Sequence, residues 1–317
     1  MSGRRIAVVL MAYGTPRTRD EILPYYTDIR RGRPPTDQQL ADLTARYEAI
    51  AGDDGELSPL ATRTEAQRQA LQAALDRLAP GRYVVMLGLK HAAPTIETAV
   101  QQVAALGIRQ IVGLVLAPHY SSFSIAQYHD RVSAAAAPFG IPVSGIDSWA
   151  TEPAFVKFLA DELRGRLAAM PPDSKVLFTA HSLPQRIIDA GDPYPDELRA
   201  TAQAVAAELG LGEWSRWALA WQSAGRTPEP WLGPDILQVI DELAASEHHA
   251  APGADDRMGV IVCACGFVAD HLEVLYDLDI EAAARARGLG LEFDRTACVN
   301  DDPAVIAALA SRVVAAS

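Results

Sequence analysis

Residues 6–16, Ile-Ala-Val-Val-Leu-Met-Ala-Tyr-Gly-Thr-Pro, decide the fold of this 317-residue chain. The stretch begins with an apolar run, Ile6 to Ala12, that lacks the polar alternation of a half-exposed strand, and a Tyr-Gly-Thr-Pro turn sequence follows it at once. Such a run is typical of a parallel strand buried on both faces. The sequence therefore predicts a first β-strand with a polar loop at its carboxyl end.

The same pattern recurs along the chain in two sets of four. The expected strands of the first set are Ile6 to Ala12, Tyr83 to Leu89, Gln110 to Ala117 and Pro142 to Ile146, and those of the second are Lys175 to Thr179, Trp217 to Trp221, Gly259 to Ala264 and Leu291 to Asp294. Helix-like stretches lie between them, at Thr36 to Ile50, Ala61 to Leu78, Thr95 to Leu106, Ser124 to Ala137, Pro153 to Ala169, Pro195 to Leu209, Ile236 to Ala245 and Pro303 to Ala316. This alternation predicts an α/β protein with two mostly parallel four-stranded sheets flanked by helices.

The boundary between the two sets is expected near residues 148–152, where an apolar stretch turns polar and Pro153 opens a new helix. The chain then divides into an N-terminal lobe, residues 1–149, and a C-terminal lobe, residues 150–317. The last helix can pack back on the first lobe.

Composition excludes several classes of function. Apolar residues make up 49% of the chain and charged residues 21%, which is typical of an ordered globular protein. The formal net charge of −12 disfavours nucleic acid as a partner. The longest interval without a charged residue, between Arg109 and Asp130, contains proline, histidine and serines, so no membrane insertion is expected. Three cysteines in a chain of this size indicate a reducing, cytoplasmic location, and a monomer is the default.

Polar residues follow most of the expected strands. In open parallel sheets ligands bind at the carboxyl ends of the strands, so these residues are candidates for a site. His91, His119 and His181 each follow a strand, and a carboxylate-rich segment begins at Asp270. We expect the three histidines and this segment to face one crevice.

The carboxylate-rich segment contains Glu273, Asp277 and Glu281 at intervals of four residues. On a helix this spacing places three carboxylates on one face, where like charges repel. Such a row suits a divalent cation or a relay of protons. An ordinary solvated acidic face explains the spacing equally well.

A second unusual block runs from Tyr25 to Arg33, aromatic and then cationic, and Arg46 and Tyr47 follow it. Guanidinium groups beside aromatic rings suit a flat ligand that bears carboxylates, although a solvated helix end would look the same. No nucleophile elbow, dinucleotide-binding glycine motif or Walker loop occurs in the sequence. Cys263 and Cys265 are expected to be buried, and an iron–sulfur cluster is not expected.

Ten motifs, taken in order, resemble those of ferrochelatases, and most closely those of the soluble coproporphyrin ferrochelatases found in Gram-positive bacteria. They lie at residues 11–16, 25–33, 46–50, 88–91, 116–119, 180–184, 191–196, 221–223, 230–235 and 266–277. The resemblance implies a chelatase-like fold of two Rossmann-like lobes, with a porphyrin cleft between them. It implies a lyase of heme biosynthesis that inserts Fe²⁺, as a substrate, into coproporphyrin III, with no bound organic cofactor.

The resemblance also assigns roles to individual residues. His181 and Glu273 become the catalytic and iron-binding pair, and Tyr13 lies on the opposite face of the porphyrin. The further porphyrin contacts that it implies are Arg30, Arg46, Tyr47, Ser58 and Tyr128. Asp277 and Glu281 become a path for metal or protons. The alternatives are a ferrochelatase that acts on protoporphyrin IX and a carrier that binds heme or metal without turnover.

Overall fold

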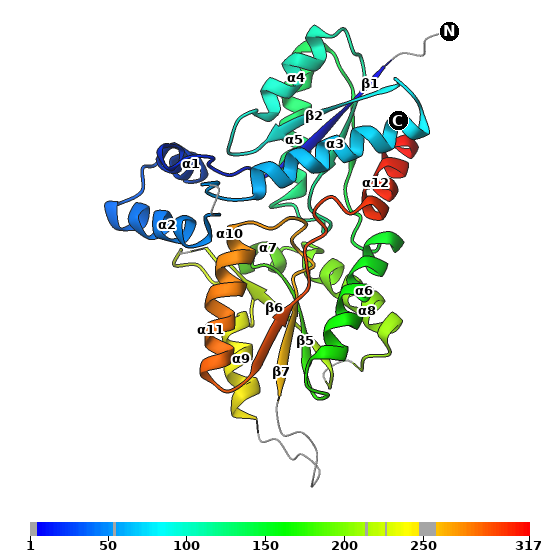
Figure 1. The fold of residues 1–317 in the computed structure, drawn as a ribbon. Coiled ribbons are helices and arrows are strands. Elements are labelled where there is room, and N and C mark those ends of the chain that lie inside the picture. Colours follow the sequence, from blue (N-terminus) through cyan, green and yellow to red (C-terminus); the bar gives the residue numbers. More distant parts are fainter. Residues whose placement is uncertain (1–4, 53–54, 213–214, 226, 247–257) are drawn as a thin grey trace.

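Two four-stranded parallel sheets form the framework of the molecule (Figure 1). The structure is a computed structural model that describes residues 5–52, 55–212, 215–225, 227–246 and 258–317. The first sheet contains β1 (Ile6–Ala12), β2 (Tyr83–Leu89), β3 (Ile111–Val115) and β4 (Val143–Ile146), and the second contains β5 (Lys175–His181), β6 (Trp217–Gln222), β7 (Gly259–Cys263) and β8 (Glu292–Arg295). All the expected strands are confirmed, and their ends differ from expectation by at most two residues.

Both sheets have the same topology. Their strand orders are β2-β1-β3-β4 and β6-β5-β7-β8, so the first strand of each half is an inner strand with the next two on either side of it. After β1 the chain forms β2 on one side of β1 and then crosses over to form β3 on its other side. The strands β5, β6 and β7 follow the same course. In open α/β sheets this reversal opens the crevice in which ligands bind, at the carboxyl ends of the central strands.

The helices cover the sheets as the pattern predicts, and several segments of the chain are helical that were not expected to be. The expected helices are α2 (Asp37–Ile50), α3 (Leu60–Leu78), α4 (Ile96–Ala105), α5 (Ile125–Ala136), α6 (Pro153–Ala169), α8 (Tyr194–Leu209), α9 (Ile236–Ala245) and α12 (Pro303–Ala315). The structure adds α1 (Ile22–Ile29), α7 (Gln185–Asp189), α10 (Leu272–Val274), the π-helical η3 (Leu275–Ala282), α11 (Ala283–Gly288) and the short 3₁₀ turns η1 (Arg19–Glu21) and η2 (Ala137–Phe139). The carboxylate-rich segment is thus helical, but its middle is wound as a π-helix.

Helix α2 begins at a capping box. The Thr36 hydroxyl accepts a hydrogen bond from the Gln39 amide at 3.2 Å, and the Gln39 side chain accepts one from the Thr36 amide at 3.0 Å. These two bonds satisfy backbone donors that a helix start leaves free. They fix where α2 begins, and hence where Arg46 and Tyr47 lie in its last turns.

One hydrophobic cluster joins the two halves of the molecule, the first half being built on the β1–β4 sheet and the second on the β5–β8 sheet. It includes buried residues of β1 and β5, and also of helices α3, α6, α8 and α12. Helix α12 runs beside α3 of the first half, where the hydroxyl of Tyr83 lies 2.7 Å from that of Ser317 (Figure 1). We propose the division between residues 149 and 150 as the lobe boundary, with α12 as the element that returns to the first lobe.

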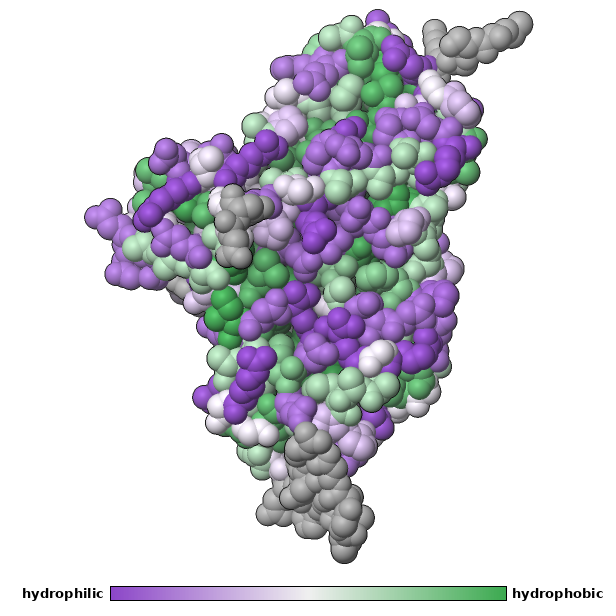
Figure 2. Space-filling model, viewed as in Figure 1, coloured by the Kyte–Doolittle hydropathy of each residue, from purple (hydrophilic) through white to green (hydrophobic). Residues whose placement is uncertain are grey.

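Hydrophilic side chains cover much of the face seen in Figure 2, and apolar side chains are interspersed among them. Of the helices in the described part of the chain, none combines the length and the apolar character needed to span a bilayer.

Gly266 marks a close approach between two segments next to β5. A β-carbon at this position would lie 2.4 Å from Cβ and 2.6 Å from Cα of Ala180, so the backbones would have to separate. We predict that Gly266→Ala lowers the free energy of unfolding by roughly 1–3 kcal/mol, as overpacked sites do. The measurement is urea unfolding. Gly288→Ala is the control, because a β-carbon there meets nothing within 4 Å; equal stability of the two variants would contradict the prediction.

Candidate active site

The two inner strands deliver the central residues of the site. His181 is the last residue of β5 and lies opposite Gln222 of β6, while Tyr13 directly follows β1. Both side chains therefore lie at the carboxyl end of a central strand, where the parallel topology predicts a ligand site. His181 and Glu273 keep about a third of their side chains exposed, and Tyr13 keeps 44%.

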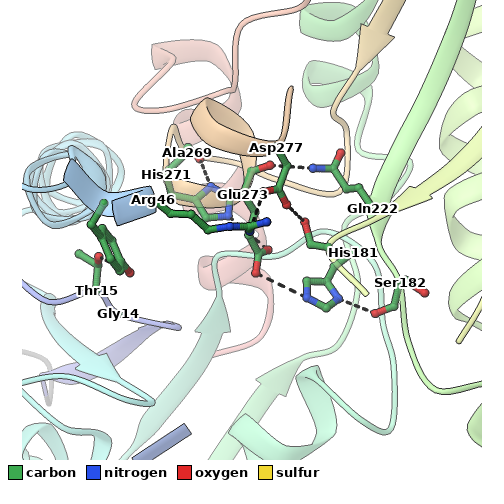
Figure 3. Close-up of polar contacts among 12 residues, drawn as sticks. Gly14, Thr15, Arg46, His181, Ser182, Gln222, Ala269, His271, Glu273 and Asp277 are labelled. Carbon is green, nitrogen blue, oxygen red and sulfur yellow. Dashed lines mark hydrogen bonds and ion pairs between the residues drawn. The ribbon is translucent and has the colours of Figure 1, made fainter. Parts of the chain in front are cut away.

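The ring of His181 is held in one orientation. Its Nδ1 lies 2.5 Å from the backbone carbonyl of Ser182, which can only accept a hydrogen bond, so Nδ1 carries a proton (Figure 3). Ser182 is itself fixed, because its amide donates to the Gln222 carbonyl at 2.8 Å and its hydroxyl to the Leu232 carbonyl at 2.7 Å. Nε2 therefore faces the site, where it can hold a proton or offer a lone pair.

Glu273 lies between two imidazoles. Its Oε1 is 3.5 Å from Nε2 of His181, and its Oε2 is 3.7 Å from Nε2 of His271 (Figure 3). Burial raises the pKa of Glu273, but the two imidazoles outweigh it and the net pKa is lowered. Burial lowers the pKa of His181, but the Glu273 carboxylate raises it above the ordinary value. Each group therefore stabilises the charged form of the other in the unliganded chain.

Asp277 has the opposite electrostatic environment. It is 7% exposed, and burial together with the negative charge of Glu273 raises its pKa to about 6, although the Ser223 hydroxyl at 2.5 Å and Arg46 act against this. Ser223 adopts a left-handed φ of 60°, a strained conformation that occurs at functional sites. Two carboxylates four residues apart thus differ in pKa, so near neutral pH Asp277 can take up a proton while Glu273 stays ionised.

Arg46 links the two halves of the molecule. Its Nη1 lies 3.2 Å from Oδ1 of Asp277, and its guanidinium stacks over the ring of Tyr276 at 4.6 Å. This contact joins α2 of the first half to η3 of the second (Figure 3). Glu281 is exposed on η3, but its charge contributes to the raised pKa of Asp277. Of the predicted carboxylate row, one member is therefore buried and one solvated.

Tyr13, in the first half of the molecule, packs against His91. Their rings are 4.5 Å apart, and Nδ1 of His91 lies 2.7 Å from the Asp28 carboxylate. Partial burial raises the pKa of Tyr13, and the next largest cause is the negative charge of Glu273. The negative charge of Glu273, in the second half, therefore acts on the hydroxyl of Tyr13, in the first half.

The other predicted porphyrin contacts are three buried hydroxyl side chains and the partly buried Arg30. Tyr47 is 2% exposed and its hydroxyl lies 3.3 Å from that of Thr15, while Ser58, also 2% exposed, accepts a hydrogen bond from the Leu60 amide at 3.4 Å. Tyr128 is 5% exposed with Nζ of Lys90 5.1 Å above its ring. Arg30 caps the end of α1 and stacks over Tyr26 at 5.6 Å. Their contact with a porphyrin stays a prediction.

Comparison with known proteins identifies the family. The ferrochelatase family model matches residues 5–317. The chain is 44% identical over 308 residues to a ferrochelatase of Herpetosiphon aurantiacus, with 95% of this chain and 96% of the relative covered. It is 42% identical to the coproporphyrin III ferrochelatase of Halalkalibacterium halodurans (98% and 97% covered) and 43% identical to that of Geobacillus kaustophilus (99% and 96% covered). The chain belongs to the ferrochelatase family.

Membership of the ferrochelatase family confirms the enzyme class expected from the motifs. Solved structures confirm the chelatase-like fold. SirB from Bacillus subtilis with Fe³⁺ aligns with a TM-score of 0.58 at 12% identity, covering 98% of this chain and 94% of that one. CbiX, described as the terminal enzyme of siroheme biosynthesis in denitrifying bacteria, aligns with a TM-score of 0.53 at 13% identity, covering 99% and 100%. At these identities the likeness concerns the fold alone.

The expectation that His119 faces the same crevice as the other two histidines is wrong. His119 is 2% exposed, its Nε2 lies 2.9 Å from the Thr201 hydroxyl, and burial lowers its pKa to about 3. After β3 the chain turns toward α8, so the ring is buried between the halves. Position at a strand end locates a residue near the site but does not fix the direction of its side chain.

Sequence reasoning gave no role to His271, Ser223, Tyr276 or the His91–Asp28 pair. His271 and Ser223 stand beside residues that were singled out, and Ser223 directly follows a strand. The strand-end rule and the motif at residues 221–223 both included Ser223 but gave it no role. The pairing of His91 with Asp28 spans 63 residues of sequence, and no local signal indicates it.

We predict that the imidazole of His181 titrates above its ordinary pKa, because the Glu273 carboxylate stabilises the protonated ring. Glu273→Gln removes this charge and should lower the pKa of His181, while Glu281→Gln, an exposed control on the same segment, should leave it unchanged. The measurement is an NMR titration of the His181 ring protons in the unliganded protein. Identical titration curves for wild type and Glu273→Gln would contradict the ion pair.

Proposed function

We propose that this ferrochelatase inserts ferrous iron into coproporphyrin III to give coproheme, a step of heme biosynthesis. The observation that carries the proposal is the His181–Glu273 pair at the end of β5, together with Tyr13 at the end of β1. A base and a carboxylate on one side and an aromatic hydroxyl on the other suit a flat macrocycle between them. Relatives that bear the name coproporphyrin III ferrochelatase support the choice of porphyrin.

Ferrous iron is a substrate in this proposal, held by His181 and Glu273. Imidazole and carboxylate both bind divalent metals at about 2.1 Å, so two ligand atoms 3.5 Å apart can reach one ion. Among the described residues there is no group of three or more His, Cys, Asp or Glu side chains arranged to hold a metal ion. A passing substrate needs fewer protein ligands than a resident ion, because the four porphyrin nitrogens take it over.

Proton removal is the second task, since two pyrrole N–H protons leave as Fe²⁺ enters. We assign the neutral form of the His181 ring, with a lone pair on Nε2, the nitrogen that faces the site, as the group that accepts a proton. Asp277 and the exposed Glu281 then provide the route outward, because Asp277, with its pKa near 6, exchanges protons close to neutral pH. The dication also gains from the negative charge of the neighbouring carboxylates.

Carboxylate recognition sets the preference for the porphyrin. Coproporphyrin III carries four propionates and protoporphyrin IX two, so additional cationic and hydroxyl donors favour the former. We propose Tyr13, Arg30, Arg46, Tyr47, Ser58 and Tyr128 as the porphyrin contacts. Arg30 forms no ion pair with any carboxylate in the described part of the chain, so its guanidinium is available to a propionate.

The proposed reaction needs no organic cofactor. It also involves no iron–sulfur cluster, because the three cysteines of the chain supply fewer thiolates than a cluster needs. All three are buried and free, which is compatible with a reducing cytoplasm. We propose a cytoplasmic enzyme that acts as a monomer.

We predict that His181→Ala abolishes iron insertion while porphyrin binding is retained, because the substitution removes the proton acceptor and iron ligand but few ring contacts. The assay is anaerobic turnover with Fe²⁺ and coproporphyrin III, with binding followed by porphyrin fluorescence. If His181→Ala inserted iron at the wild-type rate, the assignment of His181 as proton acceptor and iron ligand would be wrong. Tight binding without turnover by the wild type would favour a carrier.

We predict a higher kcat/KM for coproporphyrin III than for protoporphyrin IX. Arg30→Ala should lower kcat/KM for coproporphyrin III by about tenfold or more, through KM, because it removes a charge-assisted hydrogen bond. Arg77→Ala, exposed near the end of α3, is the control and should have no effect. Equal efficiency with both porphyrins would contradict the assigned preference and leave iron insertion intact.

A further inference from the structure

A loop of the first half is held by a carboxylate of the second. The segment that follows β3 reaches Asp192, which lies between α7 and α8. Oδ2 of Asp192 accepts hydrogen bonds from the Ser121 hydroxyl at 3.1 Å, the Ser122 amide at 2.7 Å and the Ser122 hydroxyl at 2.6 Å. Three donors on one carboxylate oxygen fix its orientation, and charge-assisted bonds of this kind are stronger than neutral ones.

The other carboxylate oxygen of Asp192 is linked to the candidate site through Tyr194. Oδ1 accepts a hydrogen bond from the amide of Tyr194, the first residue of α8, at 3.1 Å. The hydroxyl of Tyr194 donates to the backbone carbonyl of His181 at 3.2 Å. The Tyr194 ring is 7% exposed and lies 5.6 Å from that of Trp221, on the strand beside β5. A continuous chain of contacts therefore runs from the first-half loop to His181.

Helix α8 makes further contacts with the first half. Oε2 of Glu197 accepts hydrogen bonds from the Tyr120 amide at 2.6 Å and the Ser148 hydroxyl at 2.8 Å. One turn later, the Thr201 hydroxyl lies 2.9 Å from Nε2 of His119, a residue of the first half. Asp192, just before α8, and Glu197 and Thr201, within it, all contact segments of the first half. The start of this helix therefore cannot move independently of that half.

We propose that Asp192 and Tyr194 are positioning residues that set the place of His181 relative to the first half. The inference rests on the proposed function, in which residues of the first half hold the porphyrin and His181 approaches it from the second. A proton acceptor must lie within hydrogen-bond reach of its target, and a displacement of about 1 Å can cost a factor of about 100 in rate. Neither residue touches the porphyrin in this scheme, so both act through His181.

Tyr194→Phe is the sharpest test, because it removes the bond to His181 and keeps the ring against Trp221. We expect kcat for iron insertion into coproporphyrin III to fall about tenfold while KM stays within about twofold, as for a group that acts on the chemical step. The NMR signals of the His181 ring should also shift in the unliganded protein. Tyr83→Phe is the matched control, since it removes a buried tyrosine hydroxyl bond, 2.7 Å to Ser317, at the far end of the first half.

Asp192→Asn is the second variant. An asparagine offers one acceptor oxygen, so it can satisfy either the serine donors or the Tyr194 amide but not both. We expect the same fall in kcat and the same shift of the His181 signals. Asp241→Asn, at an exposed ion pair with Arg285, is its control and should change neither.

The proposal is overturned if Tyr194→Phe keeps the wild-type kcat and His181 signals, or if Tyr83→Phe lowers kcat as much as Tyr194→Phe does. Should Tyr194→Phe fail to fold, the Asp192→Asn result decides in the same way. The His181 signals need no porphyrin or iron. They therefore report on positioning even if the wild type shows no insertion, a result that would contradict the proposed function instead.

Discussion

Parallel pairing around two inner strands is the constraint on which the rest of the structure depends. Because β1 and β5 are each flanked by the next two strands of their half, their carboxyl ends are the points where the chain reverses direction across the sheet. Tyr13 and His181 occupy these points. The apolar strand interiors need only be buried on both faces, so the chemistry can be confined to the first residues beyond them.

The two carboxylates of the site, Glu273 and Asp277, have different polar and charged neighbours and therefore different pKa values. Glu273 has an imidazole beside each oxygen, and its pKa is lowered in spite of burial. Asp277 has a hydroxyl and a single guanidinium contact, and burial raises its pKa to about 6. The difference follows from the number and charge of the neighbours, since both groups belong to one short helical segment. One carboxylate is therefore suited to a cation and the other to a proton.

Strand positions were predictable from the sequence because an unbroken apolar run between turn signals has few other structures open to it. The ten motifs also indicated the fold and the His181–Glu273 pair. The π-helical winding of 275–282 was not predictable, since it depends on backbone bonds that leave no periodic trace in the side chains. Contacts across the halves were equally hidden: Arg46 and Asp277 are 231 residues apart, and Ser122 and Asp192 are 70 apart. The burial of His119 by α8 was missed for the same reason.

Arg46 couples substrate binding to the proton route under the proposed function. In the unliganded chain it forms one contact of 3.2 Å with Asp277 and remains 27% exposed, so a propionate can compete for it with two oxygens. The guanidinium lowers the pKa of Asp277, and its transfer to a propionate removes that effect. The pKa of Asp277 then rises, and the carboxylate becomes a better proton acceptor. Binding of the carboxylated porphyrin thus prepares the outward path for the protons that iron displaces.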